Sequence, residues 1–129
     1  MFYSWPIVVA EENTESNKAT IEMPMSAGVI HQVDIVFPDT CDHDIRVQIY
    51  DASFQLWPSN RGGAIRGDAA VMSFRDFYEM SAANNNLKGV AWLTDTAKAG
   101  TIWIHVGVLP LAILQPFSLA ELLRAVQRS

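Results

Sequence analysis

The sequence predicts an all-β chain built as an antiparallel β-sandwich, and two neighbouring segments are the main reason. Residues 29–37 and 45–51 each alternate apolar and polar side chains, with a polar loop at residues 39–44 between them. Successive side chains of a strand point to opposite faces of its sheet, so each segment is expected to bury one face, as antiparallel sheets do. The expected buried side chains are Val29, His31, Val33, Ile35 and Phe37 in the first segment and Ile45, Val47 and Ile49 in the second.

Further strands are predicted on both sides of this pair, giving about eight in all. They are expected at residues 19–25, 54–57, 64–74, 90–94 and 101–109. Residues 76–83 fit either a strand or a helical turn. Residues 58–63 contain a proline and paired glycines, which favour a loop. In the last strand the alternation predicts a buried set of Ile102, Ile104, Val106 and Val108.

The N-terminal region, residues 1–18, reads as an apolar segment of ten residues followed by an acidic linker. Two interpretations remain open for the apolar segment. It forms the first strand of the sandwich, or it is an arm that packs on a neighbouring subunit through Phe2, Tyr3 and Trp5. The second interpretation follows because exposed aromatic clusters mark interaction sites. The sandwich itself is expected to span residues 19–110.

The C-terminal region, residues 111–129, is predicted to be a tether followed by an amphipathic helix. Ser118 precedes Glu121 by three residues, the spacing of a capping box at a helix start. One face of the helix is expected to carry Leu119, Leu122, Leu123 and Val126. Because so short a helix is marginal in water alone, it needs a surface on its own sandwich or on a partner.

Composition excludes several classes of protein. The chain has 129 residues, which favours one domain, and a net charge of −5 with nine scattered lysines and arginines, which argues against nucleic-acid binding. Cys41 is the only cysteine, so no internal disulfide is possible. No apolar run is long enough to span a bilayer, and the N-terminus lacks the basic start of a signal peptide. A cytoplasmic protein, or one assembled into a particle there, is expected.

The candidate chemical groups predict no metal, cofactor or catalytic set. Structural zinc sites take four ligands in separated pairs, whereas Cys41, Asp42, His43 and Asp44 are consecutive. Asp39 with Asp42 and Asp44 does not match the calcium-binding pattern of EF-hands, and cation binding by this loop stays open. A cupin-like enzyme would cluster His31, His43 and His105 around a metal inside the barrel, and their spacing offers no such cluster.

Three aromatic side chains alternate out of phase with the main apolar set: Tyr50, Trp57 and Trp103. They are expected on an outer sheet face, where they would stack on sugars or pack against another subunit. The competing interpretation is a second small core beneath the C-terminal helix.

The organisation of the chain resembles that of small single jelly-roll proteins of virus particles. The resemblance covers residues 19–110 and lies in the N-terminal arm, residues 28–38, residues 55–60 and the late strand at residues 101–108. It implies a sandwich that tiles or decorates a viral shell, with terminal extensions that lock neighbours together.

The leading hypothesis is therefore a non-enzymatic structural protein of a viral capsid, head decoration or tail. Its predicted partners are copies of itself and other structural subunits, and its expected location is the virion. The alternative is a carbohydrate- or ligand-binding β-sandwich module that uses Tyr50, Trp57 and Trp103 as its stacking surface.

Overall fold

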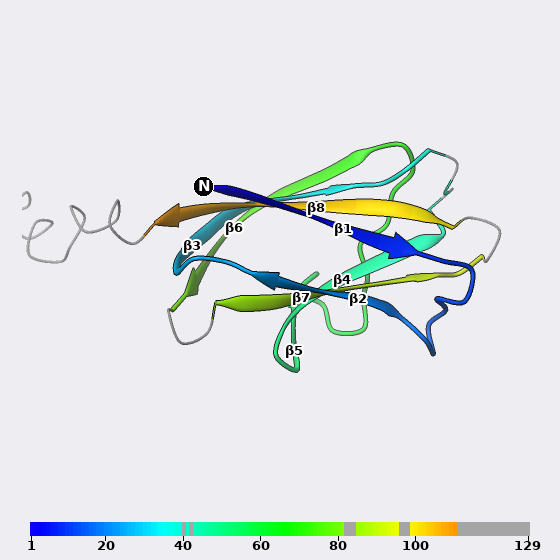
Figure 1. The fold of residues 1–129 in the computed structure, drawn as a ribbon, viewed down its shortest axis with the longest axis horizontal. Coiled ribbons are helices and arrows are strands. Elements are labelled where there is room, and N and C mark those ends of the chain that lie inside the picture. The colour runs from blue at the N-terminus through cyan, green and yellow to red at the C-terminus, as the bar shows by residue number, and fades with distance from the viewer. Residues whose placement is uncertain (40, 42, 82–84, 96–98, 111–129) are drawn as a thin grey trace, which may run out of the picture.

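The computed structural model describes residues 1–39, 41, 43–81, 85–95 and 99–110, and these form two antiparallel four-stranded sheets. The strands are β1 (Phe2–Val9), β2 (Ala19–Pro24), β3 (Gly28–Val36), β4 (Ile45–Asp51), β5 (Phe54–Trp57), β6 (Val71–Met80), β7 (Asn86–Leu93) and β8 (Gly100–Pro110). One sheet has the order β1-β8-β3-β6 and the other β2-β7-β4-β5 (Figure 1). The all-β, sandwich-like architecture expected from the sequence is thus confirmed. The segment predicted as a C-terminal helix lies outside the described residues.

The core is built from alternate residues of both sheets. In β4, Ile45, Val47 and Ile49 are each 0% exposed, as the alternation predicted. The predicted set of β8 is equally buried, since Ile102, Ile104, Val106 and Val108 are all 0% exposed. Burial of such side chains contributes about 1.5–3 kcal/mol each, which makes this shared core the main stabilising feature of the fold.

Strand β3 departs from the predicted alternation because it contains a β-bulge. Its register with β6 and β8 shifts between Ile30 and Gln32. An extra residue in a strand reverses which side chains face the core beyond it. Ile30 therefore points into the core and is 0% exposed, while His31, which was expected on the buried side, is half-buried at the bulge.

The N-terminal segment forms the first strand of the sandwich. Residues 2–9, for which a first strand and an arm were both open interpretations, pair with β8 from Phe2 opposite Gly107 to Val9 opposite Gly100. The Met1 amino group donates to the Val108 carbonyl at 2.8 Å, which places the N-terminus beside the end of β8 (Figure 1). Ile7 and Val9 enter the core, so the domain begins before residue 19.

The strands of the second half also differ in extent from those predicted. A single strand, β6, spans residues 71–80 and so crosses the boundary between the two segments expected at residues 64–74 and 76–83. Ile65 forms only an isolated bridge with Val47. Strand β7 starts at Asn86, four residues before the predicted start at residue 90. Gly67 is buried against Phe37, where a Cβ would lie 2.9 Å from the ring, and it lies outside the strands.

Candidate functional site

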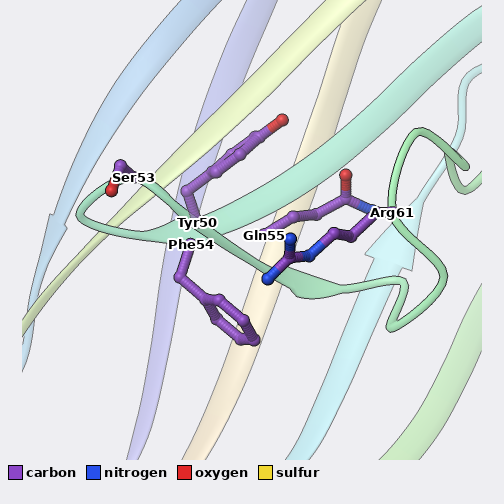
Figure 2. Close-up of a pocket in the computed structure, with 5 residues that line it drawn as sticks. All are labelled: Tyr50, Ser53, Phe54, Gln55 and Arg61. Atoms are coloured by element: carbon purple, nitrogen blue, oxygen red, sulfur yellow. The ribbon is translucent and has the colours of Figure 1, made fainter.

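The hairpin of β4 and β5 forms a shallow pocket of about 350 Å³. Its lining residues are Tyr50, Ser53, Phe54, Gln55 and Arg61. The rings of Tyr50 and Phe54 extend in different directions from the hairpin, and the side chains of Gln55 and Arg61 lie between them (Figure 2). The pocket is thus open to solvent and framed by two aromatic rings and one guanidinium.

A buried amide network positions the loop that carries Arg61. Gln55 is 8% exposed, and its Nε2 donates to the carbonyls of Pro58 at 2.7 Å and Asn60 at 3.1 Å. Its Oε1 accepts from the Gly62 amide at 3.2 Å. Gln48 is also buried, and its Nε2 donates to the Gly63 carbonyl at 2.7 Å. Because buried amides without partners are costly, these bonds hold the loop of residues 58–63 against the sheet.

Both aromatic rings of the pocket lie near a cation. The Arg61 guanidinium lies 5.7 Å from the centre of the Phe54 ring, and the Lys88 ammonium lies 5.8 Å from that of Tyr50. The Tyr50 hydroxyl donates to Gln48 Oε1 at 2.8 Å. Cations over ring faces are mutually stabilising contacts. Such a site can bind a sugar ring or an anionic group by stacking and charge.

The three aromatic residues selected from the sequence do not come together. Tyr50 lines the pocket on one sheet, whereas Trp103 is 43% exposed on the outer face of the other sheet. Trp57 is only 3% exposed, so its predicted place on an outer face is wrong. The β4–β5 register shifts between Ile49 and Tyr50, which places Trp57 opposite Ile49 on the buried side. Phe54, which also lines the pocket, was not selected from the sequence, and strand pairing places it opposite Asp51.

Trp57 belongs to an aromatic cluster between the sheets. Its ring centre lies 5.6 Å from that of Phe74 and 6.1 Å from that of Tyr78, both on β6. Its Nε1 donates to Asp76 Oδ2 at 2.7 Å. Tyr78 in turn donates its hydroxyl proton to the Asp51 carboxylate, and burial together with this bond raises the pKa of Tyr78 to about 12. Tyr78 therefore stays a neutral donor at physiological pH and joins β6 to β4.

The outer face of the sheet β1-β8-β3-β6 carries a row of apolar residues across all four strands. Cross-strand pairing places Pro6 opposite Trp103, Trp103 opposite Val36, and Val36 opposite Val71. Val71 is 55% exposed, and Val8, next along β1 on this face, is 69% exposed. We call these five residues the outer apolar row. The adjacent row is polar, with Ser4, His105, Asp34 and Ser73 opposite one another.

The other sheet presents a different outer face. Glu22 lies opposite Lys88, and Lys88 lies opposite Tyr50, so one row of that face carries both signs of charge. Of the large apolar side chains that are exposed among the described residues, Phe54 alone belongs to this sheet. The others lie on or directly beside strands β1, β6 and β8: Met1, Phe2, Val8, Val71, Met72, Phe77 and Trp103.

The predicted interface residues at the N-terminus divide between the two faces of β1. Phe2 is 71% exposed, and its ring packs edge-on against His31 at a centroid distance of 6.0 Å. Tyr3 and Trp5 alternate with it and stack on each other at 5.4 Å, half-buried against the core. The Tyr3 hydroxyl bonds with Ser26 Oγ at 2.9 Å and accepts from the Ser26 amide at 3.2 Å, and these bonds with Ser26 lower the pKa of Tyr3. Phe2 is therefore the N-terminal aromatic that is available to a partner.

The residues of the loop at 39–44 and the histidines are dispersed. Cys41 is 1% exposed and its thiol donates to the Gly67 carbonyl at 2.9 Å, and burial raises the pKa of that thiol. His43 is exposed in the loop, while His105 lies on the outer face of β8. Within the described residues no three His, Cys, Asp or Glu side chains gather closely enough to hold a metal ion. Asp42 lies outside those residues.

The C-terminal residues predicted to form an interface, Leu119, Leu122, Leu123 and Val126, also lie outside the described part of the chain. No family model and no curated protein matches this sequence. In the portion that the structure describes, no helix has the length and apolar character required to cross a membrane.

Proposed function

We propose that this chain is a structural assembly protein with jelly-roll topology, acting through subunit–subunit contacts in a viral capsid, head decoration or tail. The strand pairing supports the topology. β1 pairs with β8, β2 with β7, β3 with β6 and β4 with β5, which is the pairing of one long antiparallel hairpin. Contacts of β3 with β8 and of β4 with β7 then roll this hairpin into two sheets. Double-sheet jelly rolls of eight strands occur in viral capsid proteins, lectins and cupins.

The observation that carries the assembly role is the outer apolar row. Exposed apolar side chains that lie together and are rimmed by polar residues are typical of protein–protein contacts. The row runs across one sheet only, and the polar row of Ser4, His105, Asp34 and Ser73 lies beside it. In this proposal the row contacts copies of the chain and other structural subunits, and the helix predicted from the sequence of residues 118–129 would add a second contact.

Replacing Trp103 and Val71 with serine is expected to abolish or sharply reduce assembly. Both side chains are exposed, at 43% and 55%, so the fold keeps its core while the contact loses apolar area. The native mass would be measured by multi-angle light scattering over a range of concentrations, with urea unfolding as the test of folding.

Phe54→Ser is the matched control, because Phe54 is 54% exposed on the other sheet. It should leave the assembled mass unchanged. A wild-type chain that remains a monomer at millimolar concentration, alone and with its co-expressed structural proteins, would overturn the assembly role.

The second candidate function is ligand binding by the β4–β5 pocket, favoured by the pairing of Tyr50 and Phe54 with Arg61. Calorimetric titration with neutral and uronic-acid oligosaccharides tests it. Binding of the acidic series, weakened at least about tenfold by Arg61→Ala, would support this function, since an exposed charge pair and a stacking contact contribute about 1–2 kcal/mol together. If no sugar gives a heat of binding, ligand binding by this pocket is rejected.

A further inference from the structure

Strand β6 is the longest of the four edge strands. An edge strand presents unpaired N–H and C=O groups, and proteins usually shorten it or interrupt it with proline or lysine. β1 contains Pro6, β2 has 6 residues and ends at Pro24, and β5 has only 4 residues. β6 has 10 residues, lacks proline and lysine, and lies at the end of its sheet, and its register with β3 shifts beside Asp76 and Phe77.

The centre of β6 carries a large apolar side chain that the fold does not use. Phe77 is 74% exposed, the highest value among the exposed large apolar side chains. Its neighbours hold the backbone in place, since Asp76 Oδ1 accepts the Phe77 amide proton at 2.7 Å while Oδ2 accepts from Trp57. The Phe77 side chain is thus exposed, while its backbone is held through Asp76 to the buried Trp57.

From these features we infer that β6 pairs antiparallel with β6 of a second copy, with Phe77 opposite Phe77 of the partner subunit at a two-fold axis. The inference rests on the proposed function, because it names one of the subunit contacts. A two-fold interface brings the same surface together from both copies, so each symmetric register is centred on one residue opposite itself. The amide of Phe77 stays with Asp76, and the ladder bonds come from the residues flanking it.

Charge selects the register. With Phe77 at the centre, Arg75 lies opposite Glu79 of the partner subunit, and the reciprocal pair forms by symmetry. Both side chains are exposed, and within their own sheet they lie opposite Gln32 and Val29, so neither faces an opposite charge there. Registers centred on Arg75, Asp76 or Glu79 place like charges directly opposite each other, which destabilises a sheet.

The remaining central registers lack this complementarity. Centring on Phe74 places Arg75 opposite Ser73, and centring on Tyr78 places Arg75 opposite Ser81. In the inferred register, two ion pairs flank an aromatic pair on one face, and Phe74 lies opposite Met80 of the partner subunit. Cross-strand ionic and aromatic pairs of this kind each stabilise antiparallel sheets.

A charge-swap series on the full chain, followed by sedimentation equilibrium, tests the pairing. The wild type should dimerise reversibly. Arg75→Glu and Glu79→Arg should each weaken the dimer at least about tenfold, because symmetry turns two attractive pairs into two repulsive ones. The double variant carrying both changes should restore wild-type affinity, and Phe77→Lys should abolish the dimer.

Glu22→Arg is the matched control, since it makes the same change in charge on an exposed residue of the edge strand β2. It should not affect the dimer. Failure of the double variant to restore affinity, or a dimer that tolerates Phe77→Lys, would overturn the pairing. If the charge series has no effect while Trp103→Ser with Val71→Ser reduces the assembled mass, the pairing is wrong and the assembly role stands. A chain that is monomeric throughout would overturn the pairing, and the assembly role would be overturned only if the chain also stays monomeric with its co-expressed structural proteins.

Discussion

Removal of residues 1–10 is expected to unfold the domain. The deletion takes Ile7 and Val9, 2% and 1% exposed, out of the core and strips β8 of its partner along β1. Loss of two buried aliphatic side chains costs about 2–5 kcal/mol each, which is comparable to the 5–15 kcal/mol that stabilises a typical domain. Far-UV circular dichroism and urea unfolding of the truncated chain would measure this.

Two point variants in β1 provide the control for that deletion. Ile7→Ala should lower the free energy of unfolding by about 2–5 kcal/mol, since it leaves a cavity between the sheets. Val8→Ala, the next residue, should change it by less than about 0.5 kcal/mol because Val8 is 69% exposed. A truncated chain that keeps full stability and loses only its assembly would restore the interpretation of these residues as an arm.

The second large effect is expected at Trp57. Trp57→Ala should lower the free energy of unfolding by about 3–5 kcal/mol, because it removes a ring that packs on Phe74 and Tyr78 between the sheets. Trp57→Phe keeps most of that packing and loses the bond to Asp76, which should cost only about 1 kcal/mol. Chemical denaturation followed by circular dichroism would rank the variants.

Trp103→Ala is the matched tryptophan variant for this series. Trp103 lies on an outer face and is 43% exposed, so its loss should cost about 1 kcal/mol or less in stability. Equal losses at Trp57 and Trp103 would contradict the placement of Trp57 in the core.

The contrast between these two tryptophans shows where side-chain alternation predicts burial correctly and where it does not. Alternation placed both on outer faces, and for Trp103 that was correct because β8 runs without interruption of its phase. Trp57 follows a register shift in the β4–β5 pair, and Ile30 precedes a bulge in β3. Bulges depend on how neighbouring strands fit together, so a single strand's sequence does not reveal them.

The candidate sites depend on tertiary structure in the same way. Tyr50 was selected from the sequence and Arg61 was not, because only the loop bonded to Gln55 brings Arg61 to the hairpin. The outer apolar row joins Pro6, Trp103, Val36 and Val71, which are distant in the chain and become neighbours only through strand order.

Side-chain alternation, a property of consecutive residues, was therefore sufficient for the all-β class, for the approximate position of most strands and for the buried sets of β4 and β8. The place of residues 2–9 as a strand, the position of Trp57 and the edge location of β6 were decided only by pairing between distant segments. Pairing depends on which strands can bury their apolar faces together, and that energy belongs to the folded chain as a whole.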